Sequence, residues 1–302
     1  MRRTILIWAM TALGAIALGG MVVVAGQQGW FGGTAHRWLT QANTAMKQSR
    51  WPDAQAHLDH LLTTFPDSPL APSALLKLGE VQEAQQHLVE ARAAYQQLLE
   101  QFRDSPLASE TQTHLGQVNI ALLFSSVPTE MDTVYPVQSG DSLGKIAAAH
   151  GTTVEFLKKA NRLGRDVIRP GQQLKVPKGR FSVVVDKSQN QLLLTQENRF
   201  MKTYTVATGK DNSTPVGTFK ITDKLINPTW YKTGAVLPPG SPKNILGTRW
   251  LGFTLKSYGV HGTTLPETIG KQASDGCVRM LNADVEELYD ILPANTPVTI
   301  TD

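Results

Sequence analysis

Cysteine is nearly absent from this chain, which has a single thiol, Cys277, among its 302 residues. That thiol has no partner for an internal disulfide, and no cysteine follows the N-terminal apolar segment, which argues against a lipoprotein. Charged residues are also scarce, at 18% against 41% hydrophobic residues. This balance is typical of folded domains rather than of a disordered tail, and the length predicts several small domains.

Metal-ligand clusters and a strong charge excess are missing as well. His57 and His60 lack further cysteine or carboxylate partners at metal-ligand spacing, so we expect surface histidines, no metal and no organic cofactor. The formal net charge is only +4. We interpret this excess mostly as solvated surface and expect no nucleic-acid partner.

The N-terminus does contain a long apolar run. Two arginines precede an uncharged, mostly apolar segment, Thr4–Ala25. A membrane-spanning helix takes about 20 such residues, so residues 1–26 are predicted to be a transmembrane anchor. By the positive-inside tendency the arginines stay in the cytoplasm and the rest of the chain lies outside. If Val23–Ala25 is instead a cleavage site, the chain is secreted.

An internal repeat follows, because the stretch that begins at Trp51 recurs from Leu88 with an offset of 37 positions. Repeats of this period are stacked supersecondary units. An Asp-Ser-Pro turn ends one helix and opens the next, which predicts helical hairpins over residues 35–124. The pattern resembles tetratricopeptide repeats and implies a spacer or a surface for a protein partner. The first apolar face is Leu58, Leu61, Leu62 and Phe65, and Gly79 and Gly116 are equivalent positions.

A new periodicity begins after a short polar linker, Ser125–Thr133. A strand, a helix that stops at Gly151, a second short helix and a closing strand predict a β-α-α-β unit over residues 133–178. Its G-D-S-L, K-A-N and P-G-Q-x-L-x-V-P segments resemble the LysM family, which implies binding to N-acetylglucosamine-containing glycans such as peptidoglycan. Asp141 and Ser142 would also cap a helix whatever the domain binds. The groove positions that the resemblance implies are Gly140, Asp141, Ser142, Asn161 and Ile168.

The remaining residues, 179–302, alternate β-rich runs with turns. Prolines between Pro215 and Pro242 exclude long helices across the middle. One late helix is predicted at Ala283–Leu292, introduced by Asn282. The predicted fold of this part is mainly β, a curled sheet or sandwich with a late helix.

The lone thiol has a possible chemical partner, because His261 lies 16 positions before Cys277 at the end of a predicted strand. On adjacent β elements, histidine can take the thiol proton, leave a thiolate nucleophile and return the proton to a leaving amine. Gly276 lets the backbone turn so that neighbouring amides face an oxyanion. The alternative is an inert buried cysteine and a structural histidine. An oxidisable, unpaired thiol outside the cytoplasm favours a function.

The stretch HGTTLPETIGKQASDGCVRM, which begins at His261, resembles the catalytic signature of the L,D-transpeptidase (YkuD-type) family. The segments ATGKDNSTPVGTF, NPTW and PKNILGTRWLGF extend the similarity upstream. The resemblance implies that Cys277 is the acyl-accepting nucleophile and His261 its base, with the Gly276 and Cys277 amides in an oxyanion hole. Arg279 alternatively pairs a substrate carboxylate. Further implied residues are Ser274 and Arg279 in support, and Gly262, Thr263 and Asp275 at the substrate.

Asp275 departs from the family pattern, which usually has histidine at this position. Two readings stay open: Asp275 raises the pKa of Cys277 through like-charge proximity, or it helps to orient His261. Gly262 has no side chain that could orient the histidine, so we expect a backbone carbonyl in that role.

The resemblance implies a reaction on peptidoglycan. Cys277 attacks the amide between the third residue and the D-Ala of a stem tetrapeptide, and the thioester passes to an amine, which gives a cross-link or an anchored protein. With water as acceptor the enzyme is a carboxypeptidase, and a non-catalytic peptidoglycan-binding scaffold is the other alternative. Anchor, repeats, glycan-binding domain and transferase follow in the order needed to reach a wall from a membrane, so we expect the bacterial cell envelope.

Overall fold

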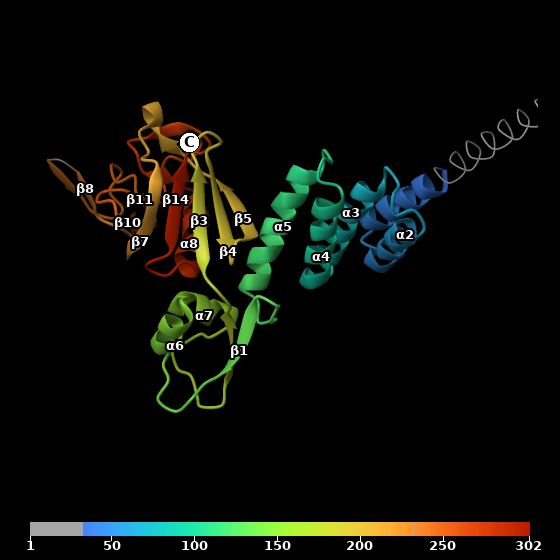
Figure 1. Cartoon of the computed structure of the whole chain (residues 1–302), viewed down its shortest axis with the longest axis horizontal. Coiled ribbons are helices and arrows are strands. Elements are labelled where there is room, and N and C mark those ends of the chain that lie inside the picture. The colour runs from blue at the N-terminus through green and yellow to red at the C-terminus, as the bar shows by residue number, and fades with distance from the viewer. Residues whose placement is uncertain (1–32, 233) are drawn as a thin grey trace, which may run out of the picture. The chain divides into compact units, whose positions relative to one another are not determined.

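We describe residues 33–232 and 234–302 of the chain from a computed structural model (Figure 1). The chain divides into two compact units, with the division after Gln112. The predicted membrane anchor, residues 1–26, lies outside the described residues. Within the described ranges, no helix is long and apolar enough to cross a membrane.

The first unit is built from helices. Leu58 and Leu61 are fully buried, as the repeat pattern predicts, and Leu62 and Phe65 pack against the same core. Gly79 allows α3 and α4 to pack closely, because an added Cβ there would lie 2.1 Å from the Tyr95 ring. The predicted helical repeats are confirmed. Helical residues 33–47 precede α2 (Trp51–Thr64), α3 (Ala71–Ala84), α4 (Leu88–Gln101) and α5 (Ala108–Leu123), which continues into the second unit.

The second unit begins with the small β-α-α-β domain that the sequence predicts. Its helices start at hydroxyl caps, since Ser142 accepts a hydrogen bond from the Lys145 amide and Thr153 accepts one from the Phe156 amide. The first helix ends at Gly151, whose φ of 62° is left-handed. The two strands pair antiparallel. The elements are β1 (Asp132–Pro136), α6 (Leu143–His150), α7 (Val154–Ala160) and β2 (Gln173–Pro177).

The C-terminal domain is an eight-stranded sheet in the order β13-β11-β10-β7-β14-β3-β4-β5. Most neighbours are antiparallel, but β14 runs parallel to β3 and β11 runs parallel to β13. Its strands are β3 (Phe181–Asp186), β4 (Gln191–Gln196), β5 (Arg199–Thr205), β7 (Gly217–Ile226), β10 (Arg249–Phe253), β11 (Gly259–His261), β13 (Val278–Arg279) and β14 (Pro297–Thr301).

Shorter elements complete this domain, and the predicted mainly-β fold with a late helix is confirmed. The helix α8 (Asn282–Ile291) begins and ends one residue earlier than predicted and packs on β10 and β11. Two strand pairs lie outside the large sheet. They are β6 (Thr208–Gly209) with β12 (Gln272–Ser274), and β8 (Trp230–Lys232) with β9 (Ala235–Leu237).

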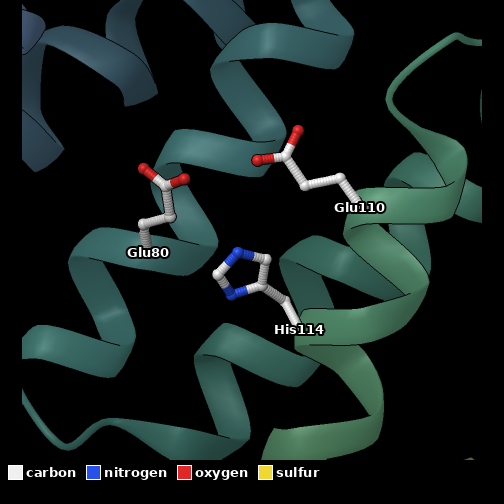
Figure 2. Close-up of side chains that lie close together, drawn as sticks. All are labelled: Glu80, Glu110 and His114. Carbon is white, nitrogen blue, oxygen red and sulfur yellow. The ribbon is translucent and has the colours of Figure 1, made fainter. Parts of the chain in front are cut away.

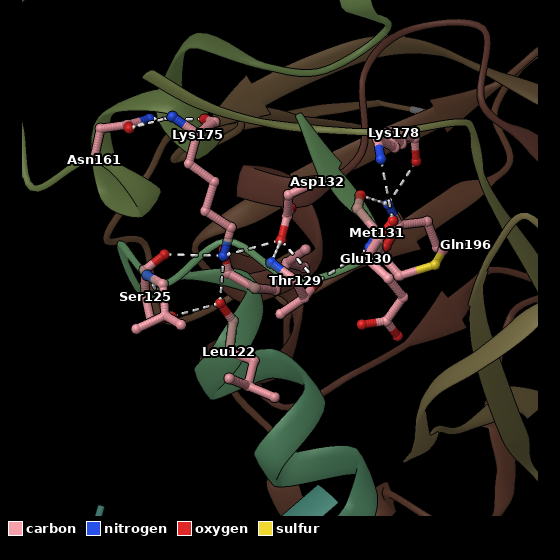
Figure 3. A network of polar contacts seen from close by, with 12 residues as sticks. Leu122, Ser125, Thr129, Glu130, Met131, Asp132, Asn161, Lys175, Lys178 and Gln196 are labelled. Carbon is pink, nitrogen blue, oxygen red and sulfur yellow. Dashed lines mark hydrogen bonds and ion pairs between the residues drawn. The ribbon is translucent and has the colours of Figure 1, made fainter. Parts of the chain in front are cut away.

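A buried lysine joins the end of α5 to the small domain (Figure 3). Lys175 of β2 is 3% exposed, and its Nζ donates to the backbone carbonyls of Leu122 at 2.6 Å and Ser125 at 3.0 Å. The same Nζ lies 3.4 Å from the buried carboxylate of Asp132. Carbonyls at a helix C-terminus lack partners within the helix, so this ammonium group satisfies groups that burial would otherwise leave unpaired.

The polar segment Ser125–Thr133, predicted as a linker, is packed on both sides. Gln196 of β4 donates to the carbonyls of Met131 at 3.3 Å and Lys178 at 2.7 Å. The small domain and the sheet also share one continuous apolar core. On α8, Asp290 accepts a hydrogen bond from Thr153 through its carbonyl and pairs with Lys159 through its carboxylate. The two domains of the second unit are therefore packed into one body.

Candidate active site

The lone thiol and the histidine lie on neighbouring parallel strands. Cys277 directly precedes β13, and His261 is the last residue of β11. The register pairs His261 with Arg279. Cys277 lies two residues before Arg279, the strand partner of His261. The register therefore brings the two segments together, and contact between the thiol and the imidazole stays a prediction.

His261 is held in one orientation and kept neutral. Its Nδ1 lies 2.6 Å from the Gly262 carbonyl, so a backbone carbonyl orients the ring, as expected from the sequence. The ring stacks on Trp250 with centroids 5.9 Å apart. Burial lowers the pKa of His261 to about 4. Backbone hydrogen bonds to Gly262 and Leu246 oppose this shift. With Nδ1 donating its hydrogen to Gly262, Nε2 is the ring nitrogen that we expect to accept a proton.

Cys277 is a protonated thiol in this environment. Burial raises the pKa of Cys277, against the opposing effects of a Gly259 backbone hydrogen bond and the Arg279 charge, and Asp275 raises it further. The Sγ atom lies 3.6 Å from the Ser257 carbonyl. The effect of Asp275 supports the first of the two interpretations, in which its charge raises the pKa of Cys277. The site therefore holds a protonated thiol and a neutral imidazole rather than a preformed thiolate.

The turn before Cys277 is fixed by a serine. The Ser274 hydroxyl donates to the Cys277 carbonyl at 2.6 Å and accepts the Gly276 amide at 3.1 Å. Gly276 has a φ of 122°, in the region that favours glycine, and an added Cβ would lie 2.9 Å from the Tyr258 ring. The Gly276 amide is thus occupied by Ser274, which differs from the predicted oxyanion hole. The Cys277 amide has no such hydrogen bond among the described residues.

Arg279 places a buried positive charge beside the thiol. It is 4% exposed, its Nη1 donates to Thr268 at 3.3 Å, and its Nε has no hydrogen-bond partner in the described ranges. Burial lowers the pKa of Arg279, while the charges of Asp275, Cys277 and Glu267 raise it. Arg279 can therefore stabilise negative charge on the sulfur or bind an anionic substrate group.

Asn282 is a site residue that sequence reasoning assigned only to the helix start. Its Oδ1 accepts the amides of Thr248 at 3.3 Å and Thr263 at 3.0 Å. An added Cβ on Gly262 would lie 2.2 Å from this oxygen. Asn282 thus fixes the turn that follows His261. The Thr263 hydroxyl accepts the Leu265 amide, so both predicted substrate residues of this turn also shape it.

Residues 180–300 match the family described as the L,D-transpeptidase catalytic domain. The putative L,D-transpeptidase YkuD of Bacillus subtilis is 36% identical over 176 residues, which cover 55% of this chain and 97% of that protein. The putative L,D-transpeptidase YqjB of the same organism is 44% identical over 126 residues, or 40% of this chain and 70% of that protein. This chain belongs to the L,D-transpeptidase family.

Two further matches lie upstream of the L,D-transpeptidase domain. Residues 135–177 match the LysM domain, and residues 39–106 match the tetratricopeptide repeat. Among solved structures, an L,D-transpeptidase from Stackebrandtia nassauensis is 26% identical with a TM-score of 0.34, and the match covers 41% of this chain and 57% of that one. The predictions of a transpeptidase with a LysM domain and tetratricopeptide-like repeats, and of an acyltransferase, are confirmed.

Most of the predicted groove residues of the LysM domain are engaged within the domain. Asp141 accepts the Gln138 amide and the Tyr135 hydroxyl, which together lower the pKa of Asp141. The Asn161 side chain bonds the Lys175 amide at 2.7 Å and the Lys175 carbonyl at 2.9 Å. Ser142 caps α6, Gly140 turns with a φ of 86°, and Ile168 packs against the core. These residues shape the domain, and their contact with glycan stays a prediction.

One cluster has residue types that could ligate a metal (Figure 2). Glu80 of α3 and Glu110 of α5 bring carboxylate oxygens within 4.8 Å of one another, and His114 follows Glu110 by one turn of α5. Exposed or half-exposed acidic groups of this kind are common without an ion. The cluster lies on the helical repeats, outside the residues of the transpeptidase domain.

Proposed function

We propose that this L,D-transpeptidase cleaves the bond between the third residue and D-Ala of a peptidoglycan stem tetrapeptide through a Cys277 thioester. The observation that carries the proposal is the parallel register of β11 and β13, which pairs His261 with Arg279, two residues after Cys277. Burial of both groups and the family membership support it.

His261 Nε2 takes the thiol proton as Sγ attacks the carbonyl carbon, which forms a tetrahedral oxyanion. The imidazolium then returns this proton to the departing amine, the C–N bond breaks, and D-Ala leaves as a free amino acid. Arg279 offsets the negative charge that appears on the sulfur, because its charge favours the ionised thiol. The Cys277 amide is the oxyanion donor, since Ser274 already holds the Gly276 amide.

An amine resolves the thioester in the second half of the reaction. It loses a proton to His261 as it attacks the acyl carbon, and the sulfur leaves as a thiol. The diamino-acid side chain of another stem gives a cross-link, whereas a protein lysine gives an anchored protein. Water would give a trimmed stem, the product of a carboxypeptidase.

A soluble tetrapeptide muropeptide tests this reaction. The intact protein should release D-Ala and form a dimer linked through third residues, and Cys277→Ala should release none. A tripeptide product without dimer would mean a carboxypeptidase. No D-Ala from folded wild-type protein would support the non-catalytic scaffold and overturn the proposal.

The other regions give the enzyme its place in the cell envelope. The LysM domain binds glycan strands, and residues 1–26 anchor the chain in the membrane. The helical repeats serve as a spacer between membrane and wall, or bind a protein partner. Fractionation of cells tests the anchor: the intact chain should follow the membranes, and a chain without residues 1–26 that is exported by another signal should not. Recovery in the culture fluid of a chain that has lost its N-terminal segment would favour cleavage.

A further inference from the structure

The loop between α7 and β2 of the LysM domain lines an open cavity of about 760 Å³. Three arginines line it: Arg162, Arg165 and Arg169. All three are exposed. Val167, between them in the sequence, is 72% exposed and offers an accessible apolar side chain. The cavity therefore combines three positive charges with an accessible apolar contact.

None of the three guanidinium groups has an ion pair or a side-chain hydrogen bond within the described part of the chain. The one carboxylate of this loop, Asp166, is taken by Lys158, whose Nζ lies 2.5 Å away. The positive charge of the loop is therefore not neutralised by the domain itself. These charges are therefore available to an anionic ligand, which guanidinium groups bind through charge-assisted hydrogen bonds.

The polar groups expected to hold glycan do not compete with these arginines. Asp141 accepts hydrogen bonds from the Tyr135 hydroxyl and the Gln138 amide. The Asn161 side chain is hydrogen-bonded to the Lys175 backbone. The arginines are thus the strongest uncommitted donors beside the cavity. A neutral sugar chain offers hydroxyl and amide groups, but a planar guanidinium group matches a carboxylate best, through two parallel hydrogen bonds.

We propose that Arg162, Arg165 and Arg169 bind the carboxylates of peptidoglycan stem peptides, so that the LysM domain recognises peptide-bearing strands over bare glycan. This inference rests on the proposed function, which makes stem peptides the substrate of the same chain. Val167 contacts the aliphatic part of the bound stem. Because the LysM and transpeptidase domains pack as one body, a peptide-bearing strand is held close to the enzyme before a stem is attacked.

Binding of peptidoglycan to immobilised protein tests the proposal with three preparations: fragments of untreated sacculi, fragments stripped of phosphate polymers by hydrofluoric acid, and soluble glycan strands that an amidase has freed of stem peptides. Wild-type protein should bind the first two alike and the third roughly tenfold more weakly, as expected for three exposed charge contacts. Its binding to untreated sacculi should also weaken as salt rises to about 0.5 M.

The variant R162Q/R165Q/R169Q should bind all three forms as weakly as wild type binds stem-free glycan. A matched control, R37Q/K47Q/R103Q, removes three exposed charges from the helical repeats and should behave as wild type. Wild-type binding by the loop variant, or a loss that follows phosphate removal instead, would overturn the proposal.

Release of D-Ala from a soluble tetrapeptide separates this inference from the proposed function. The loop variant should release D-Ala at the wild-type rate. If wild-type protein releases none while its binding still depends on stem peptides, the proposed reaction fails and the binding surface stands.

Discussion

The LysM and transpeptidase domains use their motif residues in opposite ways. In the LysM domain, Asp141, Ser142 and Asn161 are occupied by hydrogen bonds that form caps and turns. In the transpeptidase domain, His261 ends the strand β11 and Cys277 directly precedes the neighbouring strand β13, and neither residue caps a helix. In the very small domain, the motif residues mainly stabilise the fold. The larger sheet has enough other contacts to stay folded without using Cys277 and His261 for that purpose.

The largest effect should come from His261, whose replacement removes the proton acceptor but little of the core. We expect His261→Ala to lower the rate of acylation about 10³-fold or more, in line with the loss of a general base that activates a nucleophile. The measurement is stopped-flow acylation by a carbapenem. The matched variant Asn161→Ala in the LysM domain should acylate at the wild-type rate, and equal losses would erase the contrast between the domains.

Lys175 should have the next largest effect, and on stability. Lys175→Met leaves the Asp132 carboxylate and the α5 carbonyls buried without their cation, which should lower the free energy of unfolding by about 3 kcal/mol. Lys158→Met removes an exposed pair and should cost less than about 1 kcal/mol. Urea unfolding measures both. Similar losses for the two variants would contradict the structural role of the buried network.

Replacement of Asn161 should lower the stability of the protein without changing its catalytic activity. Asn161→Ala removes the bonds to the Lys175 amide and carbonyl, so we expect a loss of about 1–3 kcal/mol in unfolding free energy. D-Ala release from a soluble tetrapeptide should not change while the protein is folded. A stable variant that has lost only glycan affinity would instead make Asn161 a binding residue.

The smallest effect should be on the pH dependence of the thiol. Asp275 raises the pKa of Cys277 and Arg279 lowers it, so alkylation by iodoacetamide should rise at lower pH in Asp275→Asn and at higher pH in Arg279→Gln. The control Glu286→Gln, on α8, should leave the profile unchanged. Identical pH profiles of alkylation for all variants would show that neither charge affects the pKa of Cys277.

Local signals in the sequence were sufficient for most elements, whereas contact between Cys277 and His261 stays a prediction. Periodicity predicted the repeats, and the Gly151 stop follows from local capping rules. The late helix was predicted with Asn282 as its cap, but its cap residue is Leu281, and the Asn282 side chain instead bonds the Thr248 and Thr263 amides. The backbone partner of His261 was also predictable, because Gly262 has no side chain.

Contacts between distant segments were beyond the sequence. Lys175 reads as an ordinary surface lysine of a strand, and only the fold brings it to the end of α5. The Asn282 bond to the Thr263 amide, 19 residues away, likewise depends on the turns that the whole sheet imposes. Such hydrogen bonds carry no spacing rule, so a single sequence does not reveal them.

Mass spectrometry of the trapped intermediate tests the central claim most directly. Intact protein mixed with a tetrapeptide muropeptide and quenched in acid should gain the mass of the stem without its D-Ala, and digestion should place this adduct on Cys277. The adduct should be absent from His261→Ala at the same time point. Free D-Ala without any adduct on Cys277, or an adduct on another residue, would contradict the thioester mechanism.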